Sequence, residues 1–144
     1  MSQFNTIEDQ KFYASPQIGT ADIDAAAEMG VTVIINNRPD GEEVGQVTNA
    51  DLAAYAAGKG IKWHHIPLMP GQLTPDHITG TAQVLSDATG PVLAFCRSGT
   101  RSSMLWGLSQ AAGGMAIDEI MAKTAAGGYD FGPQRGLFEQ VAGQ

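Results

Sequence analysis

The chain has one cysteine and only eight lysine and arginine residues among 144 residues. A single cysteine cannot form an internal disulfide and suits a reducing compartment, so we expect a cytoplasmic protein. No apolar run approaches the roughly 20 residues that a membrane helix needs. The N-terminus also lacks the basic and then apolar pattern of a signal segment. The sequence therefore predicts neither a membrane span nor secretion.

The shortage of basic residues gives the chain a formal net charge of −7 at pH 7. A protein this acidic is repelled by polyanions, which argues against nucleic acid or an anionic membrane surface as a partner. Two of its few basic residues, Arg97 and Arg101, nevertheless lie within five positions of the lone Cys96. Such local positive charge indicates a small anionic ligand. The sequence leaves the oligomeric state open.

Apolar, β-branched segments alternate along the chain with segments of helical pattern. Strands are predicted at residues 13–15, 31–36, 61–66 and 91–95. Helices are predicted at residues 23–29, 49–57, 74–87, 102–112, 118–126 and 135–141. This alternation is typical of an α/β fold with a mainly parallel sheet of four to five strands and helices on both faces. Residues 1–144 contain no linker or repeat and are predicted to form one domain.

The segment around Cys96 joins a predicted strand to the helix that follows it. The strand ends at Cys96, and a loop that contains Gly99 leads through Arg101 into the helix. The first N–H groups of a helix lack partners within it, and the helix dipole favours negative charge there. A thiolate in this place should have a pKa below the free-thiol value of about 8.5. Cys96 is therefore predicted to be a nucleophile.

The null hypothesis is that a lone cysteine at a strand end is an inert hydrophobic residue. The glycine, both arginines and the helix start make that hypothesis the weaker one here. The predicted anion-binding loop consists of Arg97, Ser98, Gly99, Thr100 and Ser102.

Ligands of parallel sheets bind beyond the carboxyl ends of the strands, so residues 37–40, 67–72 and 96–101 are predicted to line one site. Asn37, Arg38 and Ser103 are its predicted supporting residues. No metal or other cofactor is expected, because His64 and His65 of one strand point to opposite faces.

Two families use a strand, a cysteine loop, an arginine and a helix in this order. Residues 96–102, CRSGTRS, resemble a rhodanese loop because four residues separate Cys96 from Arg101, whereas tyrosine and dual-specificity phosphatases have five. Residues 30–38 and 65–68 instead resemble segments of those phosphatases. Together with the Cys96 loop and residues 37–42 and 128–130, these segments resemble the phosphatase-like domain of beta-lactamase hydrolase-like proteins. That resemblance implies a dual-specificity-phosphatase-like fold.

The resemblance implies a cysteine-dependent enzyme but leaves its reaction open between two candidates. We expect sulfur transfer of the rhodanese type, in which Cys96 takes sulfane sulfur from thiosulfate or a persulfide and passes it to a thiol or cyanide. This reaction needs no strong general acid, and residues 67–71 contain no carboxylate where the phosphatases place theirs.

The alternative is a phosphatase in which Cys96 attacks phosphorus and Arg101 clamps the phosphate oxygens. Asp40 would then protonate the leaving group, and Ser102 or Ser103 would assist loss of the phosphocysteine. A second alternative is a non-catalytic module that binds anions or senses persulfides.

Overall fold

A five-stranded sheet forms the centre of the molecule, in a computed structural model that describes residues 4–143. The strands lie in the order β1-β2-β5-β3-β4. Their bounds are β1 Asn5–Glu8, β2 Phe12–Ser15, β3 Val33–Asn36, β4 Lys62–His65 and β5 Val92–Phe95. Strands β2, β5, β3 and β4 run parallel, and β1 alone is antiparallel to its neighbour. The predicted mainly parallel sheet is confirmed.

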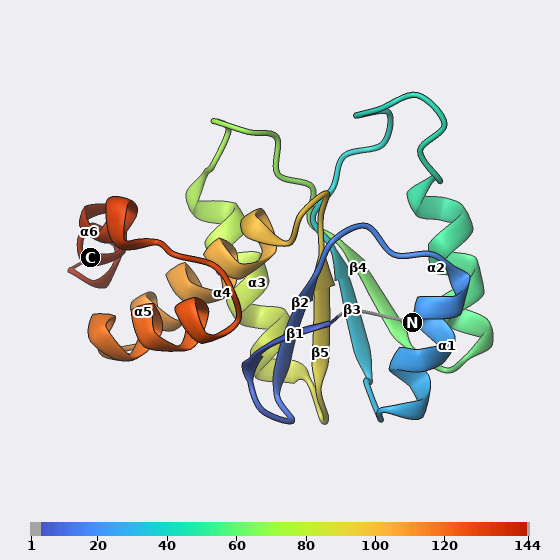
Figure 1. The fold of residues 1–144 in the computed structure, drawn as a ribbon, viewed down its shortest axis with the longest axis horizontal. Coiled ribbons are helices and arrows are strands. Elements are labelled where there is room, and N and C mark those ends of the chain that lie inside the picture. Colours follow the sequence, from blue (N-terminus) through green and yellow to red (C-terminus); the bar gives the residue numbers. More distant parts are fainter. Residues whose placement is uncertain (1–3, 144) are drawn as a thin grey trace.

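Helices cover both faces of this sheet, as the sequence predicts (Figure 1). On one face lie α1 (Thr20–Glu28) and α2 (Asn49–Gly58). On the other face lie α3 (Pro75–Asp87), α4 (Thr100–Ala112), α5 (Ile117–Ala126) and α6 (Arg135–Ala142), the last preceded by the short 3₁₀ helix η1 (Gly132–Gln134). Within residues 4–143, every helix is too short or too polar to cross a bilayer.

Strand β1 is the element that the sequence does not predict. Of its four residues only Ile7 is buried, so the strand has almost no apolar pattern to detect. The hairpin turn to β2 places Gln10 in the left-handed region, with φ of 60°, where a glycine would have signalled a turn. Tertiary pairing with β2 therefore creates this strand, and it brings Asn5 to the carboxyl end of β2.

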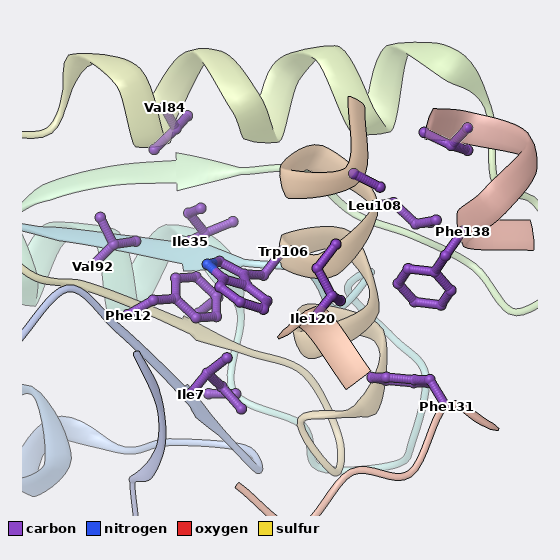
Figure 2. Close-up of a cluster of buried hydrophobic side chains, with 14 of the residues drawn as sticks. Ile7, Phe12, Ile35, Val84, Val92, Trp106, Leu108, Ile120, Phe131 and Phe138 are labelled. Atoms are coloured by element: carbon purple, nitrogen blue, oxygen red, sulfur yellow. The ribbon is translucent and has the colours of Figure 1, made fainter. Parts of the chain in front are cut away.

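Successive strand residues point to opposite faces and supply two separate cores. Ile34 and Leu93 pack against α1 and α2. Val33 and Ile35 face the cluster in Figure 2, where Phe12 stacks on the fully buried Trp106 of α4 with ring centroids 5.8 Å apart. Truncating such a tryptophan to alanine costs about 3–5 kcal/mol. This packing fixes α4 on the sheet and, with it, the position of the loop that opens the helix.

Candidate active site

Three loops meet at the carboxyl edge of the sheet and are joined by hydrogen bonds. The backbone N–H of Asn37, after β3, donates to the Phe95 carbonyl at the end of β5 (2.8 Å). The N–H of Leu68, after β4, donates to the Asn37 carbonyl (3.0 Å). The Asn37 side chain donates to the Ile66 carbonyl (2.9 Å). The structure thus brings the three predicted segments together, and Asn37 holds them to one another.

Cys96 lies at the base of this edge, directly after β5, and is fully buried. The Gly99 N–H donates to its Sγ atom at 3.0 Å. Burial by itself raises the pKa of the thiol. The backbone N–H groups of Ser102, Ser98, Gly99 and Arg101 outweigh burial and place the pKa of Cys96 below its ordinary value. The loop is therefore built to hold a thiolate.

Gly99 is required by both conformation and space. Its φ of 94° lies in the left-handed region, and a Cβ atom there would overlap the hydroxyl of Tyr129. That hydroxyl donates to the Ser98 carbonyl (3.1 Å) and accepts from the side-chain amide of Asn5 on β1 (2.8 Å). Two segments far apart in the sequence therefore brace the loop. Tyr129 belongs to residues 128–130, which contribute to the family resemblance. That resemblance is the only feature of the sequence that points to Tyr129.

Arg101, the second residue of α4, is held in a fixed orientation beside the thiol. Its Nη1 and Nη2 atoms donate to the two carboxylate oxygens of Glu42 at 2.8 and 2.9 Å, and Nη1 also donates to the Leu68 carbonyl at 2.7 Å. A bidentate pair of this kind restricts both the position and the plane of a guanidinium. The hydrogen bond to Glu42 raises the pKa of Arg101 above its usual value, and the negative charge of the nearby Cys96 thiolate adds to this increase.

Glu42 is held in turn by Arg38, whose side chain is only 1% exposed. Arg38 donates to Glu42 (2.8 Å), to Glu43 (3.1 Å) and to the Gln17 side chain (2.9 Å). A buried guanidinium needs such partners, because leaving it unpaired is costly. The hydrogen bond from Arg101, and after it the one from Arg38, holds the pKa of Glu42 below its usual value. No motif of the sequence singles out Glu42, although it belongs to the stretch 37–42 that carries part of the family resemblance.

The other predicted loop residues lie at the rim. Arg97 is 69% exposed and approaches Glu43 only at 3.8 Å. An exposed pair of this kind contributes little. Ser98 and Thr100 bond to each other through their side-chain oxygens (3.0 Å), and the Thr100 N–H donates to the Ser98 hydroxyl (3.3 Å). These two residues brace the start of α4, while Arg97 adds positive charge at the entrance.

The two serines after Arg101 differ in their bonding. The Ser103 hydroxyl donates to the Gly99 carbonyl at 2.8 Å. The Ser102 hydroxyl is buried and has no hydrogen-bond partner among the atoms of residues 4–143. Ser103 therefore maintains the loop, and Ser102 is the one with unused hydrogen-bonding capacity.

Asp40 lies in the loop between β3 and α2, two residues before Glu42, and is exposed. One of its carboxylate oxygens accepts the Asn49 N–H at the start of α2 (2.8 Å). Within the described range 4–143, no three histidine, cysteine or acidic side chains gather as a metal ion would require.

The profile of one protein family, the phosphatase-like domain of beta-lactamase hydrolase-like proteins, matches residues 3–113. The chain belongs to this family. A beta-lactamase hydrolase-like protein of Xylella fastidiosa strain Temecula1 is 34% identical over 125 residues, which is 86% of this chain but 29% of the relative. The chain thus spans less than a third of that relative's length.

Two solved structures share the fold of this family member. A Neisseria meningitidis Z2491 protein, provisionally named a phosphatase, is 34% identical with a TM-score of 0.82, over 94% of this chain and 95% of the other. The catalytic core of the S. cerevisiae PP-IP phosphatase SIW14 has a TM-score of 0.71 at 14% identity, over 98% and 87% of the two chains. The second likeness shows the fold alone.

The expectation of rhodanese-type sulfur transfer is wrong, because both the family and the Neisseria relative are phosphatase-like. That expectation depended on the rhodanese-like spacing of four residues between Cys96 and Arg101 and on the absence of a carboxylate from residues 67–71. In the structure the backbone N–H groups of four residues in and after the short loop still stabilise the Cys96 thiolate and lower its pKa. The local spacing was therefore a poor guide to the reaction.

Proposed function

We propose that the chain is a cysteine-dependent phosphatase that hydrolyses phosphate monoesters through a phosphocysteine at Cys96. The observation that carries the proposal is a buried Cys96 thiol beside an Arg101 side chain that Glu42 holds in a fixed orientation. The backbone N–H groups of the loop lower the pKa of this thiol. Membership in a phosphatase-like family supports it. The small anionic ligand that the sequence predicts is then the phosphate monoester.

In the first step the Cys96 thiolate attacks phosphorus, the S–P bond forms and the P–O ester bond breaks. Charge on the non-bridging oxygens is stabilised by the loop N–H groups and by Arg101. A guanidinium has five N–H donors. Two donate to Glu42 and one to the Leu68 carbonyl, so two remain, one on Nε and one on Nη2, for phosphate oxygens. Glu42 can therefore keep its position while Arg101 binds substrate.

The leaving oxygen needs a proton, and we propose Asp40 as its source. Glu42 and Glu43, in the same loop, are both paired with arginines. Asp40 forms no ion pair with any residue in the range 4–143, and its one hydrogen bond there, from Asn49, leaves the second carboxylate oxygen free. Asp40 is thus the carboxyl group of this loop that is available to exchange a proton.

In the second step water attacks the phosphocysteine and gives a proton to the Asp40 carboxylate that the first step left, and the P–S bond breaks to release phosphate and the Cys96 thiolate. We propose that the Ser102 hydroxyl donates to Sγ as this bond breaks. It is buried, without a partner in the described part of the chain, and its own N–H group already acts on the sulfur. Ser103 is less suited because its hydroxyl is bonded to Gly99.

Two expectations about the whole chain also remain proposals. We propose that residues 1–144 form one domain, since both cores are built on a single sheet. We also propose that the chain works in the cytoplasm, where a reactive thiolate stays reduced.

Stopped-flow hydrolysis of p-nitrophenyl phosphate tests the reaction. Wild-type protein should release a burst of p-nitrophenolate equal to the enzyme concentration, and mass spectrometry of the quenched protein should find phosphate on Cys96. The Cys96→Ser variant should bind phosphate but lose at least about 1000-fold in kcat. Phosphate binding by the wild type without any turnover would instead identify a non-catalytic anion-binding module.

A further inference from the structure

An apolar pocket of about 400 Å³ adjoins the proposed phosphate site. It lies between the loop that follows β4, helix α4 and helix α6, which share one side of the molecule in Figure 1. Its main lining residues are Leu68, Met69, Leu73, Arg101, Met104 and Leu137. Two other hollows, of about 380 and 420 Å³, contain no residue of the loop 96–101. Of these three hollows, this pocket is the one that shares Arg101 with the reactive centre.

Arg101 connects the pocket to the phosphate site. Its guanidinium donates to the carbonyl of Leu68, which is itself part of the pocket wall. Met104 lies three residues later on α4 and so shares the helix face of Arg101. A phosphate held by Arg101 thus lies at the mouth of the pocket, and the organic group of its ester can enter.

Helix α6 forms the opposite wall of the pocket and is anchored in the core. Phe138 of α6 is fully buried and packs in the cluster of Figure 2. Its neighbour Leu137 is only partly buried and lines the pocket. At the open side Met69 is 58% exposed, one of the few large hydrophobic residues in the described range that solvent reaches to this extent. Rigid α6 and flexible methionine side chains together form a surface that adapts to an apolar ligand.

The lining defines the chemistry of the occupant. Only Arg101 and Gln134 among the lining residues carry polar side chains. A sugar or nucleoside would leave its hydroxyl groups unpaired there, at considerable cost. A cavity of about 150 Å³ is enough for a benzene ring, so one aromatic ring would leave most of this pocket empty.

From these observations, and on the basis of the proposed phosphatase function, we infer that the pocket binds the organic group of the substrate. The substrate class is a phosphate monoester whose organic group is an apolar chain longer than a single aromatic ring.

Calorimetric titration with non-hydrolysable phosphonates tests the inference without requiring turnover. The ligands are methyl-, butyl-, octyl- and phenylphosphonate, each below its critical micelle concentration. Complete burial of one methylene group corresponds to about fourfold in affinity, and partial burial in an open pocket to about twofold. Octylphosphonate should therefore bind at least about 100-fold more tightly than methylphosphonate, and more tightly than phenylphosphonate.

Variants then locate the effect. The double variant Met69→Gln, Leu137→Asn should bind octylphosphonate at least about tenfold more weakly than the wild type does. Its affinity for methylphosphonate should be unchanged. Met29→Gln is the matched control, because Met29 is also exposed (48%) but lies at the end of α1, before β3 begins. It should change neither affinity.

Each contrary result has a defined meaning. Equal affinity for all four phosphonates would overturn the inference and leave the proposed phosphatase function intact. Tighter binding of phenylphosphonate than of octylphosphonate, or an undiminished octyl advantage in the double variant, would also overturn it. Failure of every phosphonate to bind would overturn it too, and hydrolysis of p-nitrophenyl phosphate would show separately whether the phosphatase function had failed with it.

Discussion

Replacing Glu42 with glutamine tests whether this carboxylate orients Arg101, the arginine proposed to bind the phosphate. Glu42→Gln keeps the size of the side chain but removes the charge that receives two N–H groups of Arg101 and one of Arg38. A charge-assisted hydrogen bond contributes about 1.5–3 kcal/mol. Loss of that orientation in the transition state should therefore lower kcat/KM by about 10- to 100-fold.

The stability of the protein should change as well, because Arg38 is buried. Removing one partner of a buried ion pair can cost about 3–5 kcal/mol. Arg38 keeps Glu43 and Gln17, and the new amide oxygen can still accept one hydrogen bond. We therefore expect a smaller loss, about 1–3 kcal/mol in the free energy of unfolding at pH 7.

The pH dependence has a defined sign. Folding lowers the pKa of Glu42, chiefly through the hydrogen bond from Arg101. Its stabilisation is thus fully present above the unfolded pKa of about 4.3 and is lost as the pH falls through the lower folded value. The difference in unfolding free energy between the wild type and Glu42→Gln should be largest near neutral pH and should shrink in acid.

Glu43→Gln provides the control, because Glu43 is half-exposed and also pairs with Arg38 but not with Arg101. Its kcat/KM should stay within about threefold of the wild type. Urea unfolding and p-nitrophenyl phosphate kinetics measure both quantities. Glu42→Gln activity within twofold of the wild type, or an equal loss in Glu43→Gln, would refute the proposed role of Glu42.

Three further predictions concern the nucleophile, its loop and the acid. The alkylation rate of Cys96 by iodoacetamide should be half-maximal at a lower pH than that of an ordinary free thiol, because the loop N–H groups lower the pKa of Cys96, and Arg101→Ala should move this midpoint upward. An unchanged midpoint would contradict the coupling. Gly99→Ala should destabilise the protein by about 1–3 kcal/mol and abolish turnover, since the new methyl group meets the Tyr129 hydroxyl; an active variant of wild-type stability in thermal unfolding would argue against this. Asp40→Asn should slow an alkyl phosphate more than an aryl phosphate in steady-state assays, and equal losses would remove Asp40 from that role.

Local sequence was sufficient for most of the fold because its signals are short-range. The apolar runs at 31–36 and 91–95 and the glycines that end the helices predicted the parallel sheet and its helical layers. Strand β1 escaped prediction because only Ile7 of it is buried and its turn, at Gln10, contains no glycine. Its existence depends on pairing with β2 rather than on its own composition.

The loop around the thiol is encoded locally, because Cys96, Gly99 and the start of α4 follow one another within a few residues. The groups that surround this loop come from distant segments and are set by the tertiary fold. Glu42 reaches Arg101 across 59 positions, and Tyr129 reaches Ser98 across 31. The apolar pocket combines three separate segments. Such contacts arise from the folding together of distant segments, so no local pattern records them. The strand, loop and helix start around Cys96 predicted a thiolate of lowered pKa but not its reaction, because chemistry at sulfur depends on the groups that the rest of the fold places around it.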